Sequence, residues 1–220
     1  MDLERYEYLT IRTYKEYEFY SEGPKGRIRK AVRFRLMPAK GGLCYNLNFG
    51  DWNEETESVN HYSVTNNGDA EKVLATVAAI VLNFMTIFPE AWVYAEGSSM
   101  ARTRRYQMGI NKLWHEIEKI ADVYGATGNA WEPFQKNITY YAFLITRKEW
   151  IDLQEETEYY MTSSTKNTAN KKKQYNDRVV DNMRDYSNEP FFNEKDEQAR
   201  KRLERIGLPK ELLEKKYGKP

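Results

Sequence analysis

Basic and hydroxyl side chains cluster in residues 91–109, AWVYAEGSSMARTRRYQMG, and they have the types and spacing of an anion-binding site. A short apolar run leads through a Gly-Ser-Ser turn into a helical pattern, whose expected N-cap is Ser98 or Ser99. Free backbone N–H groups and the positive end of the helix dipole attract anions at such a position. Cations there oppose the dipole, so they weaken the helix unless an anion or a carboxylate compensates them. Four cations follow the turn and make this stretch a candidate phosphate contact: Arg102, Arg104, Arg105 and Lys112.

Arg102 also allows two interpretations without a phosphate. It lies four residues before Tyr106, so it continues the apolar stripe that faces the core. There it could form a buried bidentate pair with a carboxylate and hold the junction between strand and helix. The carboxylates considered for this pair are Asp51, Asp69 and Glu96. The other interpretation without a phosphate is that Arg102 belongs to a protein interface. Arg104, Arg105 and Lys112 are the better candidates for outward contact.

A second row of cations follows one expected strand, RIRKAVRFRLM. Because side chains alternate along a strand, one face of this segment carries Arg27, Arg29, Arg33 and Arg35. The functional interpretation is a surface that follows the phosphates of a nucleic acid. The structural alternative is that Glu16 and Glu18 on the partner strand neutralise part of the row through cross-strand pairs.

Other chemistry has less support in the sequence. Four loop carboxylates could hold a divalent metal, but acidic residues beside glycine and asparagine are ordinary in turns and caps. They are Asp51, Glu54, Glu55 and Asp69. His115 has no Ser or Cys placed to make it a triad base. The chain contains no Walker A loop, dinucleotide-binding GxGxxG, HExxH or zinc-ligand spacing. We therefore predict no catalytic residue, no metal and no cofactor.

Hydrophobic patterns place these residues on an α+β scaffold. The expected elements are a hairpin over 14–37, strands over 43–51, 61–65, 91–95 and 138–146, and two long helices, Asp69–Phe88 and Ser99–Tyr124, the second capped by Gly125. The predicted fold is an antiparallel sheet of four to six strands with one face packed by the two helices. We expect residues 1–148 to form this core domain.

The character of the chain changes after residue 148. Residues 149–220 are polar and contain too few apolar side chains to form a core of their own. Short helical patterns are expected over 150–160 and 175–186, and two more on either side of Gly207. We predict a helical C-terminal extension that lies on the core domain or on a partner.

Composition restricts the partners. The net charge is +1, so a nucleic-acid or membrane contact must be a local patch. One cysteine and two histidines form neither a Cys/His zinc site nor a disulfide framework. The N-terminus has no apolar leader, and the longest apolar run, 73–85, is too short to span a bilayer. We expect a cytoplasmic protein without a membrane contact.

Several separated motifs occur in a fixed order between residues 14 and 125. They are GPKG at 23–26, YNLNFGD at 45–51, NNGD at 66–69, KVLATVA at 72–78 and GSSMARTRRY at 97–106. This set resembles an uncharacterised bacterial family of small single-domain proteins, a domain of unknown function. The resemblance implies no activity, and it does not extend to residues 150–220.

The sequence favours a non-catalytic binding protein whose basic surface contacts phosphates, either of nucleic acid or of another phosphate-bearing ligand. The first alternative is a structural or assembly protein that packs on partner subunits, as a homo-oligomer or with another protein, through residues 149–220. The second is a nuclease or other phosphoryl-transfer enzyme that uses Asp51, Asp69 or Glu96.

Overall fold

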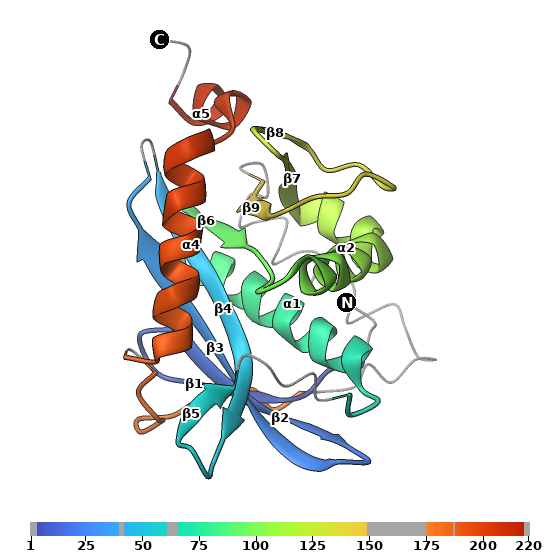
Figure 1. Cartoon of the computed structure of the whole chain (residues 1–220), viewed down its shortest axis with the longest axis vertical. Coiled ribbons are helices and arrows are strands. Elements are labelled where there is room, and N and C mark those ends of the chain that lie inside the picture. Colours follow the sequence, from blue (N-terminus) through green and yellow to red (C-terminus); the bar gives the residue numbers. More distant parts are fainter. Residues whose placement is uncertain (1–3, 40–41, 61–65, 149–174, 187, 218–220) are drawn as a thin grey trace, which may run out of the picture.

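The computed structural model describes residues 4–39, 42–60, 66–148, 175–186 and 188–217 (Figure 1). Within these ranges the chain forms one ten-stranded sheet and four helices. The strands are β1 (Tyr8–Thr10), β2 (Glu16–Gly23), β3 (Gly26–Met37), β4 (Leu43–Asn53), β5 (Ser58–Asn60), β6 (Ala91–Ala95), β7 (Ala121–Thr127), β8 (Ala130–Pro133), β9 (Phe143–Arg147) and β10 (Arg178–Val179). The helices are α1 (Ala70–Ile87), α2 (Met100–Ile120), α4 (Pro190–Ile206) and α5 (Lys210–Tyr217).

The sheet combines antiparallel and parallel pairs. Its strand order is β10-β1-β2-β3-β4-β6-β9-β7-β8, with β5 paired to β4. β1 to β4 are successively antiparallel, and the predicted hairpin turns between Gly23 and Gly26. β6 then pairs in parallel with β4, because α1 carries the chain back along the sheet between these two strands. β9 lies between β6 and β7 and is antiparallel to both.

The expected antiparallel sheet of four to six strands, packed on one face by two helices, is wrong, although the α+β class is correct. The sheet has ten strands and is mixed. Five strands were not predicted from the sequence, and four of them contain only two to four residues: β1, β5, β8 and β10. An alternating pattern is not visible over so short a run. The parallel β4–β6 pair was not predicted, because the strand beside which β6 lies after the α1 crossover depends on tertiary packing and not on a local sequence pattern.

The second helix also ends earlier than expected. α2 stops at Ile120, and the residues up to Tyr124 and Gly125 belong to β7, which pairs with β9. Ile120 and Tyr124 have helical spacing, but the hydrogen bonds to β9 override this local pattern. The fourth strand expected at 61–65 and the helix expected at 150–160 lie outside the described residues.

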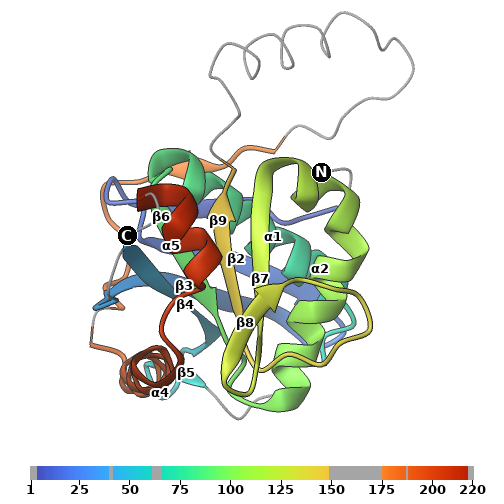
Figure 2. The same ribbon diagram turned by 90° about the horizontal axis from the view of Figure 1, so that it is seen from above.

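Both faces of the sheet are covered. α1 and α2 lie on one face, and α4 crosses the other, where Figure 2 shows it end-on. The extension therefore packs on its own sheet within the described residues. Ala199 and Leu203 of α4 contribute to a cluster with Cys44, Trp92 and Tyr94. Figure 1 shows α5 beyond the C-terminal end of α4, at one end of the sheet.

The extension is only partly as the sequence predicted. Two helices do lie on either side of Gly207, whose φ of 68° suits a glycine at a helix end. The first of them begins at Pro190. The helix expected over 175–186 is wrong: β10 pairs in parallel with β1 there, Leu9 opposite Arg178. Pairing with the edge strand β1 satisfies backbone N–H and C=O groups of β10. A helix over 175–186 would have had only a thin apolar stripe to pack against the core.

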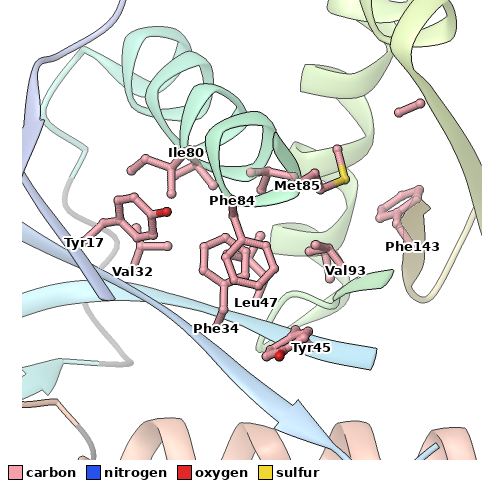
Figure 3. Close-up of a cluster of buried hydrophobic side chains, with 14 of the residues drawn as sticks. Tyr17, Val32, Phe34, Tyr45, Leu47, Ile80, Phe84, Met85, Val93 and Phe143 are labelled. Carbon is pink, nitrogen blue, oxygen red and sulfur yellow. The ribbon is translucent and has the colours of Figure 1, made fainter. Parts of the chain in front are cut away.

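The main core lies between the sheet and α1 (Figure 3). Phe84 of α1 is fully buried, and its ring stacks on Phe34 with a centroid separation of 3.9 Å. It also meets Tyr45 edge-on at 5.1 Å. Length and composition alone would let α1 span a membrane. Its packing against the sheet, with Ile80 and Phe84 fully buried, is that of the core helix of a soluble protein.

Phe84→Ala should lower the free energy of unfolding by about 3 to 5 kcal/mol, because it removes a stacked ring and leaves a cavity. Ile87→Ala in the last turn of α1 is the control, since Ile87 is partly exposed and should lose under about 1 kcal/mol. Denaturant titration followed by circular dichroism measures both. Equal losses in the two variants would contradict the central position of Phe84.

Candidate functional site

The junction between β6 and α2 is a tight turn that places the predicted cations. Ser99 is the N-cap, and its hydroxyl accepts a hydrogen bond from the backbone N–H of Arg102 at 3.4 Å. Thr103 Oγ1 accepts from the Gly97 N–H at 3.0 Å. A Cβ on Gly97 would lie 2.7 Å from the carbonyl carbon of Arg102. The turn can therefore close only with glycine at this position.

Arg102 is half-buried at the start of α2, and its guanidinium donates to the Ser98 hydroxyl. The three carboxylates considered as its partners all have other contacts. Asp51 pairs with Lys30, and Asp69 accepts from the hydroxyls of Tyr6 and Ser21. Glu96 pairs with Arg202 of α4. A carboxylate clamp at this junction joins Glu96 to Arg202.

The Glu96–Arg202 pair is bidentate and half-buried. Arg202 Nη2 and Nε donate to the two Glu96 oxygens at 2.6 and 3.1 Å. The Tyr94 hydroxyl donates to the same carboxylate. Burial, together with the Glu96 charge, raises the pKa of Tyr94, so this hydroxyl stays protonated. The pair links the end of β6 to α4.

A carboxylate of α4, Asp196, binds the middle of the sheet. Asp196 Oδ1 accepts from the Nδ2 atoms of Asn46 and Asn48 at 2.8 and 2.7 Å. Its Oδ2 accepts from Arg35 at 3.1 Å. Asn46, Asn48 and Asp196 are all buried. We call this set, together with Glu96 and Arg202, the polar seam between the sheet and α4.

Lys195 is the unusual member of this region. Its side chain is only 5% exposed, and no hydrogen bond or ion pair joins it to any residue that the structure describes. Its ammonium lies 6.0 Å from the ring centroid of Phe191. Burial lowers the pKa of Lys195 to about 8; Arg102 also lowers it, while Glu96 and Asp196 raise it. A buried charge without a partner destabilises the folded chain.

The outward side of α2 carries a continuous basic stripe. Its exposed residues recur every three or four positions and define what we call the α2 outer face: Ala101, Arg104, Arg105, Met108, Lys112, His115 and Lys119. Lys112 pairs with Glu71 at 2.6 Å, and His115 lies 3.5 Å from Glu118. Arg104 and Arg105 have no acidic partner among the described residues. α2 forms an outer layer beside α1, so this face points away from the core (Figure 2).

The arginine row on β3 has a different environment, because each member lies beside a carboxylate. The pairs are Arg27–Glu22 at 3.7 Å, Arg29–Glu54 at 3.3 Å, Arg33–Glu16 at 3.9 Å and Arg35–Asp196 at 3.1 Å. Glu16 is one of the two neutralising acids that the sequence suggested. The other, Glu18, accepts the Tyr186 hydroxyl. Arg33 is also buried, and it donates to the Tyr186 carbonyl at 3.0 Å.

The four loop carboxylates do not form a cluster in the structure. Asp51 and Asp69 have the separate contacts given above, Glu54 accepts from the Trp52 indole at 3.1 Å, and Glu55 is exposed. Among the described residues, no three His, Cys, Asp or Glu side chains are grouped as a metal site requires. The thiol of Cys44 is buried and free, and burial raises its pKa to about 12.

The polar seam was not predicted from the sequence. Lys195, Asp196 and Arg202 lie in a segment that we expected to form a short helix on the core domain or on a partner, and Tyr94 lies in the strand expected over 91–95. One signal existed, since Phe192, Ala199 and Leu203 have the spacing of a helix face that packs on another element. That stripe indicates a docked helix, but it does not indicate which carboxylate meets which strand.

Gly97→Ala should lower the free energy of unfolding by more than about 1 kcal/mol, because the added Cβ meets the backbone of α2. Gly109→Ala is the matched control within α2. Its Cβ would lie 3.7 Å from Leu74, an ordinary contact, so it should gain about 0.5 to 1 kcal/mol of helix stability. Denaturant titration of the two variants tests the turn; a stabilised Gly97→Ala would contradict it.

Lys195→Met should raise the stability at pH 7 by up to about 3 kcal/mol, the equivalent of the lowered pKa of Lys195. Between pH of about 8 and 10.5 the Lys195 side chain keeps its proton in the unfolded chain and loses it in the folded chain. The free energy of unfolding of the wild type therefore rises with pH across this window. The Lys195→Met variant should show no such rise in the free energy of unfolding. Unfolding titrations of both chains across this window provide the test, and parallel pH profiles would contradict the prediction.

Comparison with known proteins identifies the domain without giving it an activity. No match was found among curated proteins or among solved structures. A family model described as a family of unknown function, DUF6934, matches residues 2–148, which include β1 to β9, α1 and α2. Residues 149–220, with α4 and α5, lie outside that match. The chain belongs to the DUF6934 family.

Proposed function

We propose that this protein is a non-catalytic binding protein whose α2 outer face contacts the phosphates of a nucleic acid. One observation carries the proposal. Arg104 and Arg105 are exposed and have no acidic partner among the described residues, whereas all four arginines of the β3 row have one. Unpaired surface cations are the groups that a phosphate backbone recruits.

The geometry of the α2 outer face suits an extended polyanion. From Arg104 to Lys119 the helix rises about 22 Å, so its cations can follow several phosphates along a strand. The start of α2 adds the helix dipole and the exposed Ser98 and Ser99. Glu71 and Glu118 lie beside Lys112 and His115, so the strongest attraction is at the Arg104 and Arg105 end.

The β3 row has a structural role in this proposal. Arg33 and Arg35 are held by Glu16 and Asp196, and a phosphate would have to displace those carboxylates. A nucleic acid bound to Arg35 would therefore displace Asp196, which helps to hold α4 on the sheet. Cytoplasmic location also belongs to the proposal, because the single cysteine is a free thiol, as expected in a reducing compartment.

Fluorescence anisotropy with a labelled DNA duplex, and with DNA and RNA single strands of the same sequence, tests the proposal. Binding should weaken steeply between about 50 and 200 mM salt. Arg104→Ala with Arg105→Ala should weaken duplex binding roughly tenfold or more, and should reduce the logarithmic salt slope by about 0.9 per arginine lost. Both side chains are exposed, so thermal unfolding should be unchanged.

Arg27→Ala is the matched control, because Arg27 is equally an exposed arginine but pairs with Glu22 at the hairpin end. It should leave affinity and salt slope within error of the wild type. Binding that is absent for all three nucleic acids, or insensitive to salt, would overturn the proposal. A larger loss from Arg27→Ala than from the double variant would move the contact to the β3 row.

A further inference from the structure

The carboxyl end of β6, where the chain turns into α2, lies at the same level of the sheet as the first half of α4. In the parallel β4–β6 pair, Ala95 at the end of β6 is opposite Leu47, so Asn48 is level with the start of the turn. The Asn48 amide donates to Asp196 of α4 at 2.7 Å. Ligands often bind at the carboxyl ends of parallel strands, so this turn was searched for groups without a partner.

Lys195 extends from α4 toward this turn. It lies seven residues before Arg202, so both side chains leave the same face of the helix, and Arg202 pairs with Glu96 in the turn. Burial is the main cause of the lowered pKa of Lys195, and the charges of Glu96 and Arg102 also act on it, so both lie near its ammonium. Lys195 is 5% exposed and forms no hydrogen bond or ion pair with any described residue. It is therefore a buried cation aimed at the N-terminus of α2.

The charge of Lys195 is not balanced by the acids around it. Two carboxylates act on its ammonium, and each already pairs with an arginine: Glu96 with Arg202, and Asp196 with Arg35. Lys195 therefore adds a positive charge that no described carboxylate pairs with, and Arg102 brings a further positive charge close to it. Like charges repel strongly where water is excluded, and an anion between Lys195 and Arg102 would turn this repulsion into attraction.

The start of α2 supplies the hydrogen-bond donors that an anion requires. The first backbone bonds of the helix run to the Ser99 carbonyl, so the N–H groups of Met100 and Ala101 have no partner within the helix. They lie at the positive end of the helix dipole. The Ser98 hydroxyl accepts from Arg102, which leaves its own O–H to donate to a ligand. Ser98 and Ser99 are exposed, so a small anion can enter from solvent on this side.

We propose that a small phosphate-group anion, either orthophosphate or a phosphate monoester, binds between the N-terminus of α2 and Lys195 of α4. Its oxygens accept from the N–H groups of Met100 and Ala101 and from the Ser98 hydroxyl, and Lys195 donates to it from the buried side. A nucleic-acid backbone is too bulky to reach Lys195, so this site does not rest on the contact proposed for the α2 outer face. Lys195 lies outside the DUF6934 match, so the C-terminal extension completes the site.

Amide NMR spectra of the full chain, titrated with orthophosphate, test this proposal, with sodium chloride at the same ionic strength as the reference. Orthophosphate should shift the amides of residues 97–103 and 194–196 in a saturable way and leave the β2–β3 turn unchanged. A second titration with glycerol 3-phosphate distinguishes the two sources, because shifts with both probes identify a site for monoesters and shifts with orthophosphate alone identify a site for the free ion. Shifts no larger than those from chloride, or confined to other parts of the chain, would overturn the proposal.

Lys195→Met separates an anion ligand from a lysine that is only part of the packing. This variant should weaken orthophosphate binding roughly tenfold or more, because it removes the buried charge. Orthophosphate should raise the thermal unfolding temperature of the wild type and not that of the variant. Lys201→Gln is the matched control, because Lys201 is an exposed lysine of the same helix that pairs with Glu197 at 3.6 Å, and it should keep the wild-type affinity. Equal orthophosphate affinity in Lys195→Met and the wild type would refute the proposal.

Discussion

Buried amide donors on one face of the sheet need a carboxylate as acceptor, and the docking of α4 on that face supplies it. Asn46 and Asn48 point their amide donors out of β4, and both are buried. Burying such donors without an acceptor is costly, and Asp196 accepts from both. Glu96 needs a cation for the same reason, and Arg202 provides it. Both partners belong to α4, outside the DUF6934 match, so in this chain a segment beyond the family domain completes the domain's second face.

This arrangement sorts the cations of the protein into two groups. The arginines of β3 have carboxylate neighbours, and for Arg33 and Arg35 the docked C-terminal segment also supplies hydrogen-bond acceptors. Arg104 and Arg105 project from α2 on the other side of the sheet, and no described carboxylate pairs with them. Pairing thus decides which basic residues hold the fold and which can attract an anion. Lys195 belongs to neither group, because it is a buried cation of α4 that forms no ion pair with any residue the structure describes.

The proposed nucleic-acid contact follows from one feature of the scaffold. The α2 outer face is the exposed side of one helix, suited to a long polyanion that approaches from solvent. The tight turn at Gly97 orients this helix relative to β6.

The sequence by itself determined the local elements, since alternation and helical spacing depend only on neighbouring residues. It predicted the 14–37 hairpin, the β4 strand, α1, the β6-to-α2 turn with Ser98 or Ser99 as cap, and the helix break at Gly207. It also identified Arg104 and Arg105 as outward-facing. Only the tertiary structure decided the parallel β4–β6 pair, the short edge strands, and the partner of each charge. Glu96 meets Arg202, 106 residues away, and Asp196 meets Asn48, 148 residues away. Such pairs leave no periodic signal, because packing brings them together and sequence spacing does not.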